Sequence, residues 1–228
     1  MDSAFDSSID TVVFDIDGTL LDSNYHHAVA WSRAFDALVD RHVPASAIHR
    51  AIGMGGDRLV AHVAGDDVEE RLGDAVRERW EQEYDPVMSQ TRLFDRAREL
   101  LAAVQERGLQ VVLASSSIPK HAEHALELLD AKELADDWTT SEDAGESKPD
   151  PELLDRALEK VSGGRAVMIG DSVWDVEAAN RQGIPTIGLL TGGSGHQELA
   201  DAGAIAIYRD CADLLEHLDD ALERAGAA

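Results

Sequence analysis

A short apolar run that ends in two carboxylates constrains this chain more than any other stretch. Residues 12–14 are typical of a buried strand, and Asp15, Asp17 and Gly18 follow directly. Because strand side chains alternate between faces, the carboxylates of Asp15 and Asp17 would point the same way. Two buried acids side by side repel each other unless a cation lies between them or one stays protonated. The stretch therefore predicts an acidic site, with a simple Asp-Gly turn as the alternative interpretation.

The chain divides into one helical segment and one alternating segment. Residues 22–90 have apolar side chains at helical spacing and no strand pattern, whereas short apolar runs and helices alternate from residue 91 onward. Such alternation predicts a parallel sheet with helices on both faces. We therefore expect an α/β fold in which a Rossmann-like core domain, residues 1–21 and 91–228, carries an inserted all-helical cap domain, residues 22–90.

The expected elements can be placed along the chain. Strand patterns lie at residues 12–14, 109–114, 138–140, 166–169, 185–189 and 204–208. Helical patterns lie at residues 24–41, 47–53, 58–64, 68–88, 93–108, 118–129 and 152–161, then in a segment ending at 181 and from 212 onward. In the first helix we expect a buried stripe made of Ala28, Trp31, Phe35, Leu38 and Val39.

Polar side chains follow three of the expected strands. Asp15 and Asp17 follow the first strand, and Ser115 follows the second. Asp171 follows the fourth, and Lys148 lies in the loop before the helix that leads to it. Ligands of such sheets bind beyond the carboxyl ends of the strands, so we expect these side chains to converge. Carboxylates suit Mg²⁺, a lysine and a hydroxyl suit phosphate oxygens, and an aspartate can attack phosphorus.

Four segments, in this order, resemble the motifs of the haloacid dehalogenase superfamily. They are Asp15-Ile16-Asp17-Gly18-Thr19, Ser115, Lys148-Pro149-Asp150-Pro151 and Gly170-Asp171-Ser172-Val173-Trp174-Asp175. The resemblance covers nearly the whole chain, and the cap position is similar to that of the phosphoglycolate phosphatase-like and β-phosphoglucomutase-like branch. It implies a Mg²⁺-dependent phosphatase that hydrolyses a small phosphorylated metabolite, of the phosphoglycolate or sugar phosphate type, through an aspartyl-phosphate.

The resemblance also implies a role for each matching residue. Asp15 would be the nucleophile, and Asp17 would act first as general acid and then as general base. Mg²⁺ would be held by the Asp15 carboxylate, the Asp17 main-chain carbonyl and Asp171. Ser115 and Lys148 would bind the phosphoryl oxygens of the substrate.

Neighbouring residues would support this set. The amide of Gly18 would assist in binding the phosphoryl group. Asp175 would either reach the metal through water or orient Lys148. We interpret Ser116 and Ser117 as parts of a polar turn rather than as direct phosphate ligands.

Two cap residues are candidates for substrate specificity. Arg58 follows the glycine-rich loop 53–56, and it would bind a carboxylate or second phosphate of the substrate or pair with a neighbouring acid. His27 and Trp31 follow the first motif much as similar residues do in β-phosphoglucomutases, although we favour His27 as an ordinary helix residue at the cap hinge. A mutase and a non-catalytic binding protein stay as alternatives. No lysine precedes Lys120, however, so the cap lysine of the mutases has no counterpart.

Composition limits the partners of the protein. Forty-five acidic residues face 20 basic ones, of which only four are lysines, and the formal net charge is −25. Such a charge repels nucleic acid and anionic membranes, so we expect neither as a partner. We expect a small phosphorylated substrate and a monomer or homodimer. Acid-rich, lysine-poor chains are typical of salt-rich cytoplasm, so we also expect a halophilic source.

Other sequence features favour the cytoplasm. No apolar stretch is long enough to span a membrane, and residues 1–6 lack the pattern of a signal peptide. The single cysteine, Cys211, excludes an intramolecular disulfide and fits a reducing compartment, and we expect it to be ordinary packing. His121 and His124 have helical spacing, and we expect them on an exposed helix face.

Overall fold

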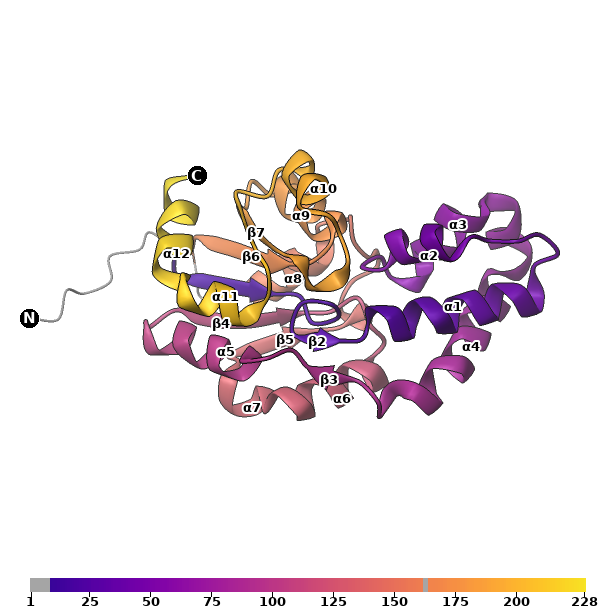
Figure 1. Cartoon of the computed structure of the whole chain (residues 1–228), viewed down its shortest axis with the longest axis horizontal. Coiled ribbons are helices and arrows are strands. Elements are labelled where there is room, and N and C mark those ends of the chain that lie inside the picture. Colours follow the sequence, from indigo (N-terminus) through magenta and orange to yellow (C-terminus); the bar gives the residue numbers. More distant parts are fainter. Residues whose placement is uncertain (1–8, 162–163) are drawn as a thin grey trace, which may run out of the picture.

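Six parallel strands form the main sheet among the described residues, and this sheet lies in the half of the molecule opposite the cap helices (Figure 1). The computed structural model describes residues 9–161 and 164–228 of the chain. The strands lie in the order β5-β4-β1-β6-β7-β8, and each neighbouring pair is parallel. Their bounds are β1 Thr11–Phe14, β4 Gln110–Ala114, β5 Asp137–Thr139, β6 Ala166–Gly170, β7 Thr186–Leu189 and β8 Ala206–Tyr208. Because β1 lies between β4 and β6, the strand order reverses there, and their three carboxyl ends are adjacent.

The alternation of strand side chains divides the core into two layers. Val12 and Phe14 of β1 point to one face of the sheet and Val13 to the other, and all three are fully buried. Helices cover both faces. The Val12 face is packed against α5 (Ala97–Glu106), α6 (Pro119–Leu129), α11 (Cys211–Glu216) and α12 (Leu218–Ala227), and the Val13 face against α8 (Glu152–Glu159) and α9 (Val173–Arg181). The α/β core expected from the alternating pattern is confirmed.

Four helices form the cap, which lies at the carboxyl end of β1 (Figure 1). They are α1 (Asn24–Leu38), α2 (Ala45–Ala51), α3 (Gly56–Ala64) and α4 (Asp66–Met88). Trp31, Phe35 and Val76 belong to an apolar cluster of the cap that is separate from the two clusters of the sheet. The expected stripe is buried except for Leu38, the last residue of α1, which is 36% exposed, and Val39 follows the helix end. The all-helical cap is confirmed.

A pair of two-residue strands ties the two ends of the cap together. β2 (Leu21–Asp22) pairs antiparallel with β3 (Arg92–Leu93), and both are too short to have a recognisable sequence pattern. The helix expected at 93–108 therefore begins only at Ala97. The expected domain boundaries, after residues 21 and 90, fall at or beside this pair of strands, and they stay a prediction. Residues 1–8 of the expected core domain lie outside the described residues.

The remaining differences concern short elements. Helices α7 (Ala131–Leu134) and α10 (His196–Ala202) were not expected, and the expected last helix is two helices, α11 and α12. Cys211 is fully buried, as expected for ordinary packing. Among the described residues, no helix has both the length and the apolar character needed to cross a membrane. The expectation about a signal peptide concerns residues 1–6, which lie outside the described part.

Candidate active site

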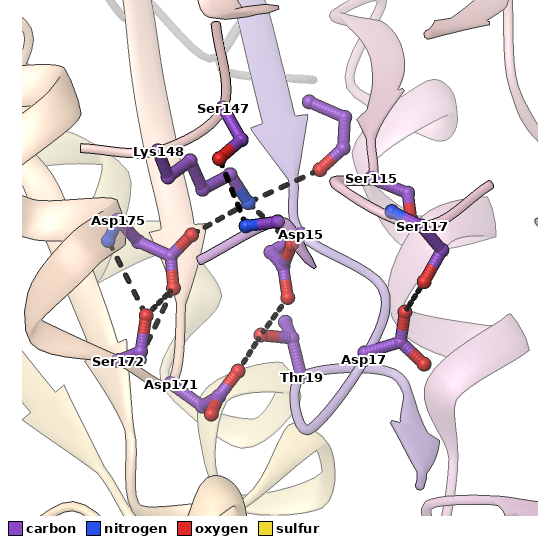
Figure 2. A network of polar contacts seen from close by, with 12 residues as sticks. Asp15, Asp17, Thr19, Ser115, Ser117, Ser147, Lys148, Asp171, Ser172 and Asp175 are labelled. Atoms are coloured by element: carbon purple, nitrogen blue, oxygen red, sulfur yellow. Dashed lines mark hydrogen bonds and ion pairs between the residues drawn. The ribbon is translucent and has the colours of Figure 1, made fainter. Parts of the chain in front are cut away.

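Acidic and basic side chains converge beyond the carboxyl ends of β1, β4 and β6, as Figure 2 shows. Lys148, from the loop before α8, is 3% exposed, and its ammonium group lies between Asp15 and Asp175. The Lys148 Nζ is 2.7 Å from Asp175 Oδ1, contacts Asp15 Oδ1 directly, and donates to the Ala114 carbonyl at 3.3 Å. The structure therefore brings together residues from three separate motifs.

Asp175 has two sets of partners that fix its carboxylate. At the start of α9 it accepts hydrogen bonds from the Ser172 amide at 3.1 Å and the Ser172 hydroxyl at 2.6 Å. Its other oxygen faces Lys148. The contact with Lys148 favours the orienting role among the two roles expected for Asp175.

Asp171 is held by polar side chains that follow the first motif. The Thr19 hydroxyl donates to Asp171 Oδ1 at 2.8 Å, and the Asn24 amide donates to Asp171 Oδ2 at 2.9 Å. Thr19 also lies 3.4 Å from Asp15 Oδ2, so its hydroxyl bridges the two carboxylates (Figure 2). Neither Thr19 nor Asn24 was assigned a role from the sequence, although both lie within nine residues of Asp15.

A glycine is needed at position 18 because of the backbone conformation and the close neighbours of this residue, rather than because of its amide. Its φ is +82°, and a Cβ there would lie 2.2 Å from Asn24 Nδ2 and 2.6 Å from Asp171 Oδ2. Its amide donates to the Leu21 carbonyl at 2.8 Å, so the expected phosphate-binding amide is already used. The glycine allows the chain to turn tightly beneath Asp171.

Asp17 lies apart from the other carboxylates and has its own partners (Figure 2). The hydroxyls of Ser23 and Ser117 donate to it at 2.6 and 2.7 Å, and His27 Nε2 is 3.3 Å away. Ser117 thus does more than shape a turn. His27 lies at the cap hinge as favoured, but it also contacts Asp17 and stacks on Tyr84 with ring centroids 3.9 Å apart.

Burial and neighbouring charges separate the proton affinities of these acids. Burial raises the pKa of Asp15 to about 7, although Lys148 opposes this shift. Burial and the charge of Asp175 raise the pKa of Asp171 well above its ordinary value. Burial also favours neutral Asp17, but hydrogen bonds from His27, Ser23 and Ser117 outweigh it and hold the pKa of Asp17 well below its ordinary value. Asp17 therefore ionises at a lower pH than Asp15 and Asp171.

The carboxylates fit a hard divalent cation. Asp15, Asp171 and Asp175 each place one oxygen within 4.8 Å of the others, and all three side chains are buried. Lys148 supplies a single positive charge against these three acids, so a cation would relieve both their repulsion and the raised pKa of Asp171. The Asp17 carboxylate lies outside this set, and its main-chain carbonyl as a metal ligand stays a prediction.

The serines after β4 differ in their surroundings. Ser115 is 1% exposed, and its hydroxyl accepts a hydrogen bond from the Ser117 amide at 3.0 Å. The Ser116 hydroxyl is buried without a hydrogen-bond partner, and Ser116 lines a small cavity together with Asp15 and Asp17. Ser115 as a phosphate ligand and Ser116 as part of a polar turn stay predictions.

Other expectations about the cap and its neighbours change with the structure. Arg58 contacts Glu146 at 2.6 Å and Asp150 at 3.7 Å, so it pairs with neighbouring acids, which was one of its two expected roles. The exposed position expected for His121 is wrong, because it is 4% exposed and lies 3.0 Å from Asp85 of the cap. Helical spacing could not reveal this contact, because Asp85 comes from a distant part of the chain.

Comparisons with known proteins agree with this geometry. The profile of the haloacid dehalogenase-like hydrolase family matches residues 9–183, and a second, HAD-hydrolase-like profile matches residues 146–221. The phosphoglycolate phosphatase of Rhodospirillum rubrum is 28% identical, with 89% of this chain and 88% of the relative aligned. The validoxylamine A 7'-phosphate phosphatase of Streptomyces hygroscopicus subsp. limoneus is 30% identical, with 89% and 94% aligned.

A solved structure extends the similarity to three dimensions. A hydrolase from Pseudomonas syringae is 33% identical and superposes with a TM-score of 0.86, covering 92% of this chain and 98% of that protein. The sequence match and the shared fold include both the sheet and the cap. The chain therefore belongs to the haloacid dehalogenase-like hydrolase family.

Proposed function

We propose that the protein is a Mg²⁺-dependent phosphatase that hydrolyses small phosphorylated metabolites through an aspartyl-phosphate on Asp15. The observation that carries this proposal is the separation of two kinds of acid in one site. Asp15 is paired with Lys148 beside Asp171, whereas Asp17 is held apart by Ser23 and Ser117. This separation supports Asp15 as the nucleophile and Asp17 as the residue that transfers protons.

In the first half-reaction, a carboxylate oxygen of Asp15 attacks phosphorus, and the bond from phosphorus to the leaving oxygen breaks. Lys148 neutralises charge on the phosphoryl oxygens while it holds Asp15 in position. A cation held by Asp15 and Asp171 would supply a positive charge that lets the anionic nucleophile approach the anionic phosphate. Asp17 is ionised in the free protein and takes up a proton when the anionic phosphate binds beside it, because the added negative charge raises its proton affinity. It gives that proton to the leaving oxygen, so the alcohol departs neutral.

In the second half-reaction, Asp17 accepts a proton from water, and that water attacks the phosphorus of the aspartyl-phosphate. The bond between Asp15 and phosphorus breaks, which releases inorganic phosphate and restores the Asp15 carboxylate. Once Asp17 has given up its proton it is a carboxylate again and can accept one from water, and Ser23, Ser117 and His27 hold it in place for both steps.

The substrate class follows from the named relatives. One acts on phosphoglycolate and another on validoxylamine A 7'-phosphate, and both names describe phosphate esters of small metabolites. We therefore place the substrate of this protein among small phosphate monoesters. The cytoplasmic location, the halophilic source and the choice between monomer and homodimer stay predictions from the sequence.

Release of inorganic phosphate from a substrate panel tests the proposal. The panel contains p-nitrophenyl phosphate, phosphoglycolate and several sugar phosphates, with Mg²⁺ and high salt. We expect Asp15→Asn to lose activity by about 1,000-fold or more, because the nucleophile is removed. Equal activity of the wild type and Asp15→Asn across the panel would show that the protein is not this enzyme. Formation of glucose 6-phosphate from β-glucose 1-phosphate would instead support a mutase.

A further inference from the structure

Two adjoining cavities lie between the cap and the core. The inner cavity, about 50 Å³, is lined by Asp15, Asp17 and residues of the cap, and the outer cavity, about 290 Å³, opens beside it. Gly56, Trp80 and Ser116 line both cavities. A phosphoryl group held at Asp15 would therefore have its leaving group in the inner cavity, and a longer leaving group would pass these three residues into the outer one.

The inner cavity offers no countercharge to a second anionic group. Among the described residues that line it, none is a lysine or an arginine, and its carboxylates are Asp15 and Asp17. The histidine of this lining, His27, turns its Nε2 toward Asp17 at 3.3 Å. Lys148 does not line this cavity, and its ammonium group contacts Asp15 and Asp175. A carboxylate on the leaving group would face acids without compensation.

The outer cavity is acidic as well. Four of the residues that line it are acids, namely Asp57, Glu78, Glu81 and Glu146. The basic residue of the lining, Arg77, donates to Glu69 at 2.8 and 3.0 Å, to Asp74 at 2.8 Å and to the Gly56 carbonyl at 3.0 Å. Its guanidinium is therefore neutralised within the cap. Arg58 pairs with Glu146 and lines neither cavity.

The cap lines the cavities with aromatic side chains, and an indole of the cap and a hydroxyl of the core have no hydrogen-bond partner. Trp31 and Trp80 stack with ring centroids 4.8 Å apart, and both line the inner cavity. Trp80 Nε1 and Ser116 Oγ are buried without hydrogen-bond partners, and their residues line both cavities. An indole N–H can only donate, whereas a serine hydroxyl can donate or accept. A ligand with apolar C–H faces and hydroxyl oxygens would pack on the rings and satisfy both groups.

We propose that these cavities select an uncharged, hydroxylated leaving group, of the polyol or sugar type, with Trp80 and Ser116 as specificity-determining residues. The proposal rests on the phosphatase activity proposed above. It places this protein apart from a phosphatase for phosphoglycolate, whose leaving group carries a carboxylate. The stacked tryptophans bind the C–H faces, and the acids of the outer cavity exclude a second negative charge.

Matched substrate pairs test the proposal directly. 2-Hydroxyethyl phosphate differs from phosphoglycolate, and glycerol 3-phosphate from 3-phosphoglycerate, by a CH₂OH group in place of a carboxylate. We expect kcat/KM of the wild type to favour the hydroxyl member of each pair by about tenfold or more. Trp80→Phe keeps an aromatic ring and removes the N–H, so we expect it to raise KM for the hydroxyl members about fivefold with a smaller change in kcat. Ser116→Ala should act in the same direction.

Two charge variants separate this proposal from binding of an anion by Arg58. Glu78→Lys adds a positive charge to the outer cavity and should shift the preference toward 3-phosphoglycerate, whereas Arg58→Gln should leave the ratios within about twofold. A wild type that prefers phosphoglycolate, or an Arg58→Gln variant that loses activity on carboxylate substrates alone, overturns the specificity proposal. In that case the activity lost in Asp15→Asn still supports a phosphatase. If no phosphate is released from any substrate, both proposals fail.

Discussion

At the scale of single residues, Gly18 offers the sharpest test of the site. A Cβ at this position would overlap Asn24 and Asp171, and the positive φ adds backbone strain. We expect Gly18→Ala to lower activity by about 100-fold and the free energy of unfolding by about 2 kcal/mol. Gly108→Ala is a matched control, because its φ is +75° and nothing lies within 4 Å of the added Cβ. It should lose about 1 kcal/mol and keep its activity. Equal activity loss in both variants would refute the role given to Gly18.

The raised pKa values of Asp15 and Asp171 predict how Mg²⁺ binding depends on pH. The pKa of Asp15 rises from 3.8 to about 7 on folding, so the native protein binds more protons than the unfolded chain in that window. Asp15 therefore costs stability as the pH rises from about 4 to about 7, and the raised pKa of Asp171 makes it act in the same direction above its ordinary pKa. Mg²⁺ requires their ionised forms, so it should raise the melting temperature more at about pH 8 than at about pH 5. Thermal unfolding with and without MgCl₂ measures this, and Asp171→Asn should weaken the response. Equal shifts at both pH values would contradict the assigned ligands.

The site residues that the sequence predicts lie in local motifs, whereas those that it does not predict act through contacts between distant parts of the chain. Asp15 and Lys148 were predicted to meet because each lies in a motif at the carboxyl edge of a parallel sheet. Ser117 and Asn24 contact Asp17 and Asp171 through hydrogen bonds across 100 and 147 residues of chain. The first contact depends on the pairing of β1 with β4, and the second on the placement of the cap against the core. No local periodicity encodes either arrangement. The residues whose roles were not predicted are those that donate hydrogen bonds to the predicted carboxylates.

At the scale of elements, α4 and α6 form a contact between cap and core. His121 of α6 is buried against Tyr84 and Trp80 of α4, and its Nε2 lies 3.0 Å from Asp85. Lys120, next to it, contacts Asp85 and Glu81 at the surface. We expect His121→Ala to lower the free energy of unfolding by about 2 kcal/mol, because it leaves a cavity and removes the hydrogen bond to Asp85 Oδ1. Lys120→Gln should have a smaller effect that disappears at high salt. Thermal unfolding at two salt concentrations measures both, and a larger effect of Lys120→Gln would contradict this assignment.

Element patterns were predictable where an apolar face is continuous. β1 is a run of consecutive buried residues, and α1 has buried residues at helical spacing, so the apolar pattern of the sequence identifies both elements. β2 and β3 have two residues each, and they exist only because the two ends of the cap meet. Their pairing depends on tertiary structure rather than on a local pattern, which explains why the helix expected from residue 93 begins at Ala97.

At the scale of the whole molecule, the net charge of −25 should govern both stability and catalysis. Repulsion among 45 acidic residues destabilises the folded protein, and salt shortens its range from about 10 Å at 0.1 M to about 3 Å at 1 M. We expect the melting temperature to rise by about 5 °C or more between about 0.1 and 1 M KCl, which is about 1.5 kcal/mol or more for a chain of this size. The same charge repels an anionic substrate, so kcat/KM should rise over this range through faster association.

Measurements at two pH values distinguish the screening of carboxylate charges by salt from the general strengthening of apolar burial by salt. Near pH 5 some of the carboxylates carry protons, so the repulsion is weaker and the rise in melting temperature should shrink. Salt that acts only by strengthening apolar burial would raise the melting temperature equally at pH 5 and pH 8, because that effect does not depend on carboxylate charge. An equal rise in melting temperature at both pH values, together with a kcat/KM that falls with salt, would contradict this prediction. It would show that the acidic surface neither destabilises the fold nor slows association of the substrate. The opposite pattern would tie the acid-rich sequence to function in a salt-rich medium.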